Sequence, residues 1–238
     1  SMKRVNNLGT RCAVACVTGQ GIMLWAKEYA GTSNITIGNL LRTSTGDLII
    51  GQPAGAGQVL HLIKIDASGS VIWARSVGSA LDELHLASMT PDDGMLLTGA
   101  FGLLVRLDPN AYVLWARTHA SSSLSSYAVG GDAIWLGQDR ILHFLNIATT
   151  GDRDLGLVCT DDQGNLLHQN RLSGIGQTAA VDRIYARPLD AASAICFSDL
   201  YGASQAQLLV IDTACTPTWS AGPPGPLVLC GFRSRPSV

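Results

Sequence analysis

The sequence predicts an all-β protein: a single five-bladed β-propeller of four-stranded antiparallel blades that spans residues 1–238. Three observations indicate this fold. Glu and Lys, which favour helices, occur two and three times, whereas glycine, which disfavours helices, occurs 26 times. A short motif of strand, tight turn and strand recurs five times along the chain. Its copies lie 42 to 53 residues apart, and propeller blades repeat every 40 to 50 residues, roughly.

Each copy of the motif places Trp or His seven positions after the residue that opens the turn. In the second copy Asp66 opens the turn, Gly69 follows within it, and Trp73 occupies the aromatic position. Asp accepts hydrogen bonds from the turn backbone and Gly adopts positive φ, so both are typical of a hairpin turn. The aromatic side chain is expected to fill the gap between neighbouring blades. The repeat residues are Trp25, Asp66, Trp73, Asp108, Trp115, Asp161, His168, Asp212 and Trp219.

Five hairpins are therefore predicted, and the intervals between them leave room for two more strands in each blade. The hairpins lie near residues 12–28, 60–76, 102–118, 156–170 and 206–220. We expect the N- and C-terminal strands to close the ring, with the apolar residues 226–232 pairing with the first hairpin. Such pairing removes a free sheet edge. A fragment of a larger ring and two chains that complete one ring are the alternatives.

The segment 66–75 reads Asp-x-x-Gly-x-Val-x-Trp-Ala-Arg. This motif resembles the blade repeat of bacterial and phage propellers of the quinoprotein-like (PQQ-like) group. The group includes quinone-dependent dehydrogenases and non-catalytic scaffolds, so the resemblance implies a fold rather than an activity. The dehydrogenases have more blades and hold their cofactor with a calcium site and an acid, and we identify no such residues in this sequence. We therefore expect no cofactor.

Charge and composition exclude several classes of partner. The 16 Lys and Arg residues do not exceed the 18 Asp and Glu residues, so no positive surplus is available to bind nucleic acid. No apolar run reaches the length of a membrane span, and no secretory signal is visible at the start of the sequence. The six cysteines lie mostly in apolar runs, so we expect free thiols. An intracellular or virion-associated location is the expectation.

Enzymatic motifs are also missing from the sequence. A glycosidase needs two carboxylates at a fixed separation, and neither Glu28 nor Glu83 has a visible partner. The aspartates fall mainly in turns, where they are expected to be solvated. The five histidines do not show metal-ligand spacing. We therefore predict a protein that is not an enzyme and binds no metal.

Two segments are predicted to be rim loops that present ligand-binding side chains. The longest interval between hairpins holds residues 139–154, which concentrate charge and histidine. Residues 199–205 form the second segment, in which a tyrosine can present its ring to a sugar. Loops on a rigid frame commonly carry function. The candidate ligand-binding residues are Trp135, Arg140, His143, Asp152, Asp154, Asp199 and Tyr201.

These observations predict a non-catalytic binding or interaction module that recognises a protein or a glycan on one propeller face. A lectin with one sugar site per blade is disfavoured, because polar and aromatic rim residues do not repeat. A structural subunit of a phage tail or bacterial surface assembly is the alternative, since low charge and 47% hydrophobic residues suit surfaces hidden in an assembly. A glycan-processing hydrolase is disfavoured. The sequence does not indicate an oligomeric state.

Overall fold

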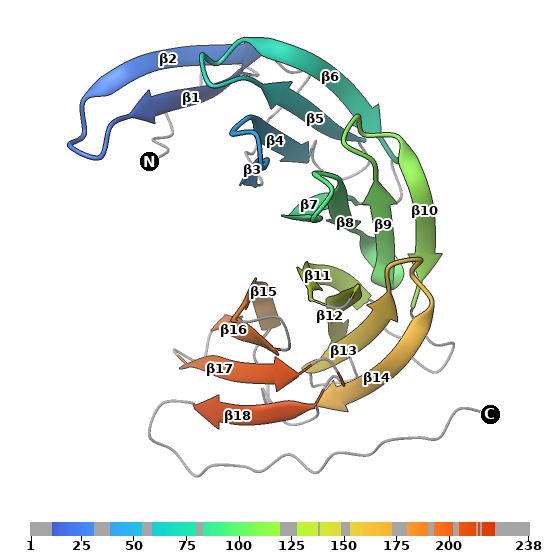
Figure 1. Ribbon diagram of the computed structural model, residues 1–238. Helices are drawn as coiled ribbons and strands as arrows, with labels where there is room; N and C mark the ends of the chain where they lie inside the picture. The colour runs from blue at the N-terminus through green and yellow to red at the C-terminus, as the bar shows by residue number, and fades with distance from the viewer. Residues whose placement is uncertain are drawn as a thin grey trace. The chain divides into compact units, whose positions relative to one another are not determined.

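The computed structural model describes most of the chain between residues 11 and 221. The described ranges are 11–30, 39–53, 59–79, 83–119, 128–137, 139–148, 153–172, 180–189, 193–201, 205–212, 214 and 216–221. They form one two-stranded and four four-stranded antiparallel sheets, and the single helical turn among them is a 3-10 turn at Ala100–Gly102 (Figure 1). The predicted all-β fold with four-stranded antiparallel sheets is confirmed. Residues 226–232, expected to close the ring, lie outside the described residues.

The chain divides into two compact units, Ser1–Leu86 and Ala87–Val238. The first unit holds the two-stranded sheet β1-β2 and the sheet β3-β4-β5-β6. Its strands are β1 (Arg11–Val17), β2 (Met23–Ala30), β3 (Leu40–Arg42), β4 (Leu48–Pro53), β5 (Leu60–Ile65) and β6 (Val71–Val77). In the four-stranded sheet, the strands follow one another in chain order, so each pairs with its neighbour through a short connection.

The other three sheets have four strands each, again in chain order. The first contains β7 (His85–Met89), β8 (Met95–Thr98), β9 (Leu103–Leu107) and β10 (Val113–Thr118). The second contains β11 (Ala128–Leu136), β12 (Arg140–Ala148), β13 (Arg153–Asp161) and β14 (Leu166–Leu172). The third contains β15 (Ala180–Pro188), β16 (Ser193–Tyr201), β17 (Gln205–Asp212) and β18 (Pro217–Ala221). The last strand of each sheet lies at a sheet edge and is called its outer strand below.

Every copy of the sequence motif forms a hairpin with the same register. In each hairpin the aromatic residue pairs with a residue near the end of the preceding strand. The register of the two strands shifts next to this pair. The pairs are Cys16 with Trp25, Lys64 with Trp73, Arg106 with Trp115, Cys159 with His168, and Val210 with Trp219. A shared register places the aromatic residues at equivalent points of the five outer strands, β2 included.

The turn residues explain why these hairpins form. Asp66 Oδ1 accepts hydrogen bonds from the backbone nitrogens of Ser68 and Ser70, each at 2.8 Å. Asp161 Oδ1 binds the equivalent nitrogens two and four residues later. The fourth turn residue adopts positive φ, 76° at Gly69 and 77° at Gly164. This geometry matches a three-residue hairpin loop in which a type I turn ends in a left-handed residue.

Apolar side chains fill the space within and between the sheets of each unit. In the second unit a buried cluster combines Phe144 and Leu157 of one sheet with Cys196 and Ile211 of the next. In the first unit a second buried cluster combines Val14 of the two-stranded sheet with Ile50 of the four-stranded sheet. Strands of a sheet that is covered on both faces have runs of apolar residues in their sequence rather than alternating apolar and polar residues. The strands of this sequence show such runs. Among the described residues, the cysteines at positions 16, 159 and 196 form no disulfide bond.

Two predicted loops are strands instead. Within the first predicted loop, Arg140–Ala148 form β12 and Arg153 begins β13, because Ile141, Leu142 and Phe144 are buried and supply the second strand of this sheet. The segment beginning at residue 199 continues β16 as far as Tyr201, in register with β17. Charged and polar residues at the strand ends gave both segments the appearance of loops.

The turn glycines provide a test of packing between sheets. A Cβ atom at Gly69 would lie 3.0 Å from the Trp25 ring, whereas one at Gly46 would meet the end of the flexible Arg42 side chain at 3.4 Å. Both glycines have positive φ, so Ala adds a similar backbone strain of about 1–2 kcal/mol at each. We expect Gly69→Ala to lower the free energy of unfolding by roughly 1 kcal/mol more than Gly46→Ala in denaturant titrations. Equal losses would show that the Trp25 contact contributes no packing constraint.

Candidate interaction surface

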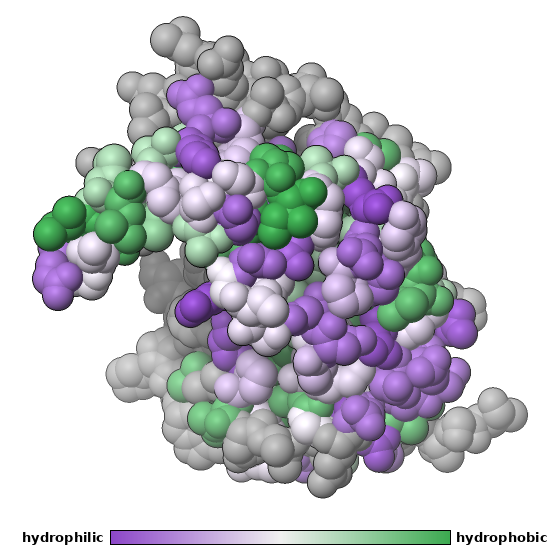
Figure 2. Space-filling model, turned by 45° about the horizontal axis from the view of Figure 1, so that its top comes forward, coloured by the Kyte–Doolittle hydropathy of each residue, from purple (hydrophilic) through white to green (hydrophobic). Residues whose placement is uncertain are grey.

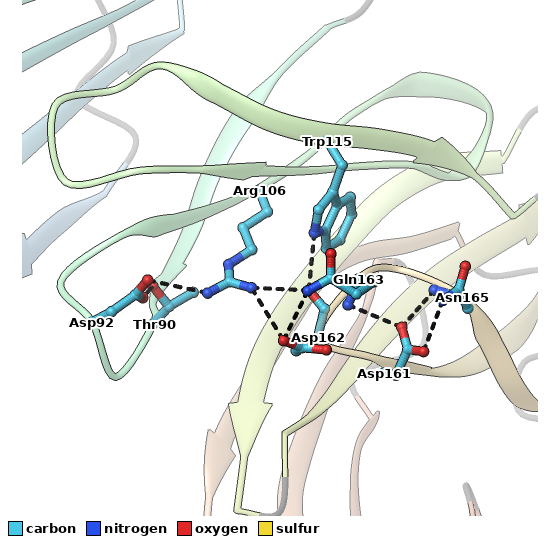
Figure 3. A network of polar contacts seen from close by, with 8 residues as sticks. All are labelled: Thr90, Asp92, Arg106, Trp115, Asp161, Asp162, Gln163 and Asn165. Carbon is cyan, nitrogen blue, oxygen red and sulfur yellow. Dashed lines mark hydrogen bonds and ion pairs between the residues drawn. The ribbon is translucent and has the colours of Figure 1, made fainter.

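A tryptophan on the outer strand of one sheet packs on a hairpin turn of the next sheet (Figure 3). The Trp115 indole Nε1 on β10 donates a hydrogen bond to the Asp162 carbonyl oxygen in the β13–β14 turn at 2.9 Å. A Cβ atom on Gly164 would lie 2.9 Å from this ring, so the turn requires glycine there. In the first unit, the Trp25 indole donates to the Ala67 carbonyl oxygen at 2.9 Å. The repeated tryptophan thus joins neighbouring sheets within both units.

Arg106 on β9 supports the same contact (Figure 3). Its Nη1 donates to the Asp162 carbonyl oxygen at 3.0 Å, and its Nη2 forms an ion pair with Asp92 Oδ2 at 3.1 Å. The guanidinium carbon lies 4.9 Å from the ring centroid of Trp135, a cation–π distance. Burial raises the pKa of Asp92, but the hydrogen bond from Thr90 and the Arg106 charge outweigh it and hold that pKa below its ordinary value. Trp135, a predicted ligand-binding residue, therefore takes part in contacts that join two sheets.

The structure spreads the candidate ligand-binding residues over two sheets. Trp135, Arg140, His143 and Asp154 lie on β11, β12 and β13, and Asp199 and Tyr201 lie on β16. Asp152 lies outside the described residues, and the side chains of Asp154, Asp199 and Tyr201 are not among those described. The structure therefore does not assemble the predicted residues into one loop site.

His143 is one of these candidates, and it is completely buried. Neither of its ring nitrogens has a hydrogen-bond partner among the described residues, and the His119 ring lies edge-on to it with the centroids 6.4 Å apart. Burial, with a smaller contribution from His119, lowers the pKa of His143 to about 3, so its ring is neutral at physiological pH. The side chain of this predicted ligand-binding residue is therefore not exposed at the surface.

Asp132 is a buried polar residue that the sequence analysis did not single out. It lies on β11, and its Oδ2 accepts a hydrogen bond from the Ala186 backbone nitrogen on β15 at 2.9 Å. Arg187 Nη1 lies 3.4 Å from the same oxygen and donates to the Ala186 carbonyl at 2.6 Å. The carboxylate and the guanidinium together satisfy both backbone groups of Ala186 at the edge of β15. An aspartate inside an apolar strand was the available signal for this contact.

The outer strands carry exposed apolar residues before the aromatic position. Two or three large hydrophobic side chains separate the turn from Trp or His in four of the hairpins, and these side chains are 36% to 64% exposed. They are Ile22, Met23 and Leu24; Val71 and Ile72; Tyr112, Val113 and Leu114; and Leu166 and Leu167. Figure 2 shows hydrophobic residues gathered in separate green patches on the face in view. The run ending at Leu114 is the candidate interaction surface developed below.

The described ranges bear on metal binding and on the role of the turn acids. They contain no group of three or more His, Cys, Asp or Glu side chains placed to hold a metal ion. All four predicted repeat acids use their carboxylates to hold turns: Asp66, Asp108, Asp161 and Asp212. No helix in the described part of the chain is long and apolar enough to cross a membrane.

Solved structures similar to this chain identify the fold. BamB from Moraxella catarrhalis matches with a TM-score of 0.55 and 17% identity, over 87% of this chain and 58% of that chain. The Nup133 β-propeller domain of Vanderwaltozyma polyspora matches with a TM-score of 0.51 and 9% identity, over 83% of this chain and 65% of that one. At these identities the likeness shows the fold alone, which is a β-propeller. No family model and no curated protein matches the chain.

The chain spans less than two thirds of the length of either structure, 58% for BamB and 65% for the Nup133 domain. The number of blades and the closure of the ring therefore do not follow from these matches.

The buried carboxylate predicts a pH dependence. Burial raises the pKa of Asp132 from 3.8 to about 6, so the folded protein binds more protons than the unfolded protein between about pH 4 and 6. The free energy of unfolding contributed by this group therefore falls by roughly 3 kcal/mol as the pH rises through that window. We expect Asp132→Asn to remove this fall in denaturant titrations at several pH values. Asp139→Asn, which alters an exposed acid beside β12, is the matched control. The same slope in all three proteins would contradict the assignment.

Proposed function

We propose that this protein is a non-catalytic β-propeller that binds another protein through exposed apolar residues of its outer strands. The run Tyr112, Val113 and Leu114 carries the proposal, because each side chain is more than half exposed although all three are large and apolar. Contiguous exposed apolar surface on a folded domain commonly marks an interaction site. Similar runs on three other outer strands, β2, β6 and β14, follow from the repeat of the hairpin motif.

A protein partner accounts for this surface better than a glycan does. Binding sites for small molecules combine an apolar lining with a few convergent polar groups in a concavity. The run at the start of β10 consists of exposed side chains on an edge strand, and two of its three members are aliphatic. Protein interfaces, in contrast, are depleted of charge at their centres and enriched in aromatic residues. A hydrolase is not supported, since the described acids with known contacts hold turns or join sheets.

We further propose that the ring has five blades and that residues 226–232 complete the sheet of β1 and β2. Two observations on the described residues support closure. The strand β1 pairs only with β2, whereas the equivalent strands β5, β9, β13 and β17 each have two neighbours. A Cβ atom at Gly21 would meet nothing within 4 Å, whereas the equivalent Gly69 and Gly164 each face a tryptophan ring. A closing strand would give β1 its second neighbour.

Truncation tests this closure. In the chain that ends at Ala221, the amides of β1 should exchange with solvent faster than in the full chain, because the strand loses its second neighbour. Hydrogen exchange followed by mass spectrometry measures this. The amides of β13, which has β12 and β14 on its two sides, serve as the internal control. Unchanged protection of β1 would contradict closure by the C-terminal segment.

Substitution of the apolar run tests the function. We expect the double variant Val113→Thr, Leu114→Thr to lose a set of proteins that the unmodified chain captures from its native host after chemical cross-linking. Leu189→Thr is the matched control, because Leu189 is 56% exposed but follows β15, the first strand of its sheet, instead of lying at the start of an outer strand. Quantitative mass spectrometry compares the captured proteins. Identical sets from the unmodified chain and the double variant would contradict the proposed function.

A further inference from the structure

We propose, on the basis of the function proposed above, that β10 binds an extended segment of the partner protein by strand addition. The segment pairs with the free edge of β10, places apolar side chains beside Val113 and Leu114, and places a carboxylate beside Arg117. Three features of the described residues carry this inference together: an edge that no described strand covers, an apolar run, and an arginine that forms no ion pair among these residues.

The edge of β10 is available for pairing. In its sheet the order is β10-β9-β8-β7, so β10 has β9 on one side and no strand on the other among the described residues. An edge strand presents backbone N–H and C=O groups that an added strand can bind. Such main-chain hydrogen bonds provide affinity, whereas side chains on alternate positions provide specificity.

The apolar run lies at the start of this edge. Val113 and Leu114 are 55% and 53% exposed, and the register with β9 shifts between Val113 and Trp115, so the strand does not alternate regularly there. An added strand therefore meets two exposed apolar side chains at this point. Trp115, the next residue, is 8% exposed and packs on the β13–β14 turn, which fixes the position of the run.

Arg117 supplies the charge that selects the segment. The aliphatic part of its side chain packs beside Gly164, where a Cβ atom would lie 2.9 Å from Arg117 Cγ. This contact fixes the position from which the guanidinium group extends. The guanidinium donates a hydrogen bond to the Ala116 carbonyl oxygen at 3.2 Å, and no carboxylate in the described ranges forms an ion pair with it. A carboxylate on the added segment would neutralise this charge.

The same charge argues against a second copy of β10 as the occupant. The strand reads Val-Leu-Trp-Ala-Arg-Thr and holds no acidic residue. Two β10 strands paired with each other would bring two arginines to one interface without a carboxylate. A heterologous segment is therefore the occupant that the charges favour.

The other outer strands fit this role less well. On β2 the equivalent cation, Lys27, already donates to Ser70 Oγ at 3.4 Å and is followed by Glu28. On β6 the equivalent Arg75 is half-buried. The strand β18 begins with Pro217, which lacks an N–H group for pairing. The strand β10 shares with β2 an exposed apolar run of three residues, and its cation, unlike Lys27, has no acidic residue next to it in the strand.

Selection of short random peptides displayed on phage tests the inference, with the full chain as the target. We expect the enriched peptides to share a run of apolar residues and an Asp or Glu at a fixed distance from it. Binding of a synthetic enriched peptide should weaken about fivefold or more in Arg117→Glu, and a Lys in place of the peptide's acid should restore it. Arg42→Glu is the control for a charge reversal elsewhere. The peptide should also slow amide exchange in β10 and leave β14 unchanged.

Three outcomes would overturn the inference. Enriched peptides that bind the Arg117→Glu variant unchanged, or that protect no β10 amide, would exclude strand addition here. Protection of β10 that rises with protein concentration without peptide would assign the edge to a second copy. Absence of enriched peptides, together with captured proteins that depend on Val113 and Leu114, would show that a folded surface binds instead. In this last case the proposed function stands, whereas it fails if the capture experiment fails as well.

Discussion

Neighbouring sheets within each unit are held in place by the contact between an outer-strand tryptophan and the next hairpin turn. The Trp115 indole supplies apolar area over Gly164 and a hydrogen bond to the Asp162 carbonyl oxygen. Such a bond contributes about 1 kcal/mol, and the buried ring contributes more through the hydrophobic effect. Both parts require the turn to have one conformation, which the Asp161 carboxylate imposes by binding two turn nitrogens. The packing of the two sheets therefore depends on the hydrogen bonds that fix the shape of the turn.

Local chemistry of this kind is what sequence reasoning recognises. The turn aspartates, the glycines with positive φ and the aromatic position recur at a fixed spacing, so the hairpins follow from the pattern. The strand β12 was missed because it starts after Asp139 and contains His143, a polar residue in a segment that turned out to be buried. The role of Asp132 was missed because its partner Ala186 lies 54 residues away. Contacts between sheets depend on arrangement in space, which no local pattern encodes.

Two titratable groups on one sheet illustrate what burial does to charge. Burial raises the pKa of Asp132 to about 6 and lowers that of His143 to about 3, so the neutral form of each is favoured. The two effects oppose each other in pH: protonating Asp132 favours the folded state, whereas protonating His143 disfavours it. Between these pKa values both side chains are neutral in the folded protein. The faces of the β11–β14 sheet therefore carry the least buried charge in mildly acidic solution.

The exposed apolar run of β10 directly precedes the tryptophan that makes this contact. Trp115 is 8% exposed and bonds to the next turn, whereas Val113 and Leu114 before it are more than half exposed. An exposed apolar edge strand invites uncontrolled pairing, and proteins limit this with charges and bulges. Both devices occur on β10, where the register shifts between Val113 and Trp115 and Arg117 follows. They leave a short edge that accepts a segment with a matching carboxylate and disfavours one without it.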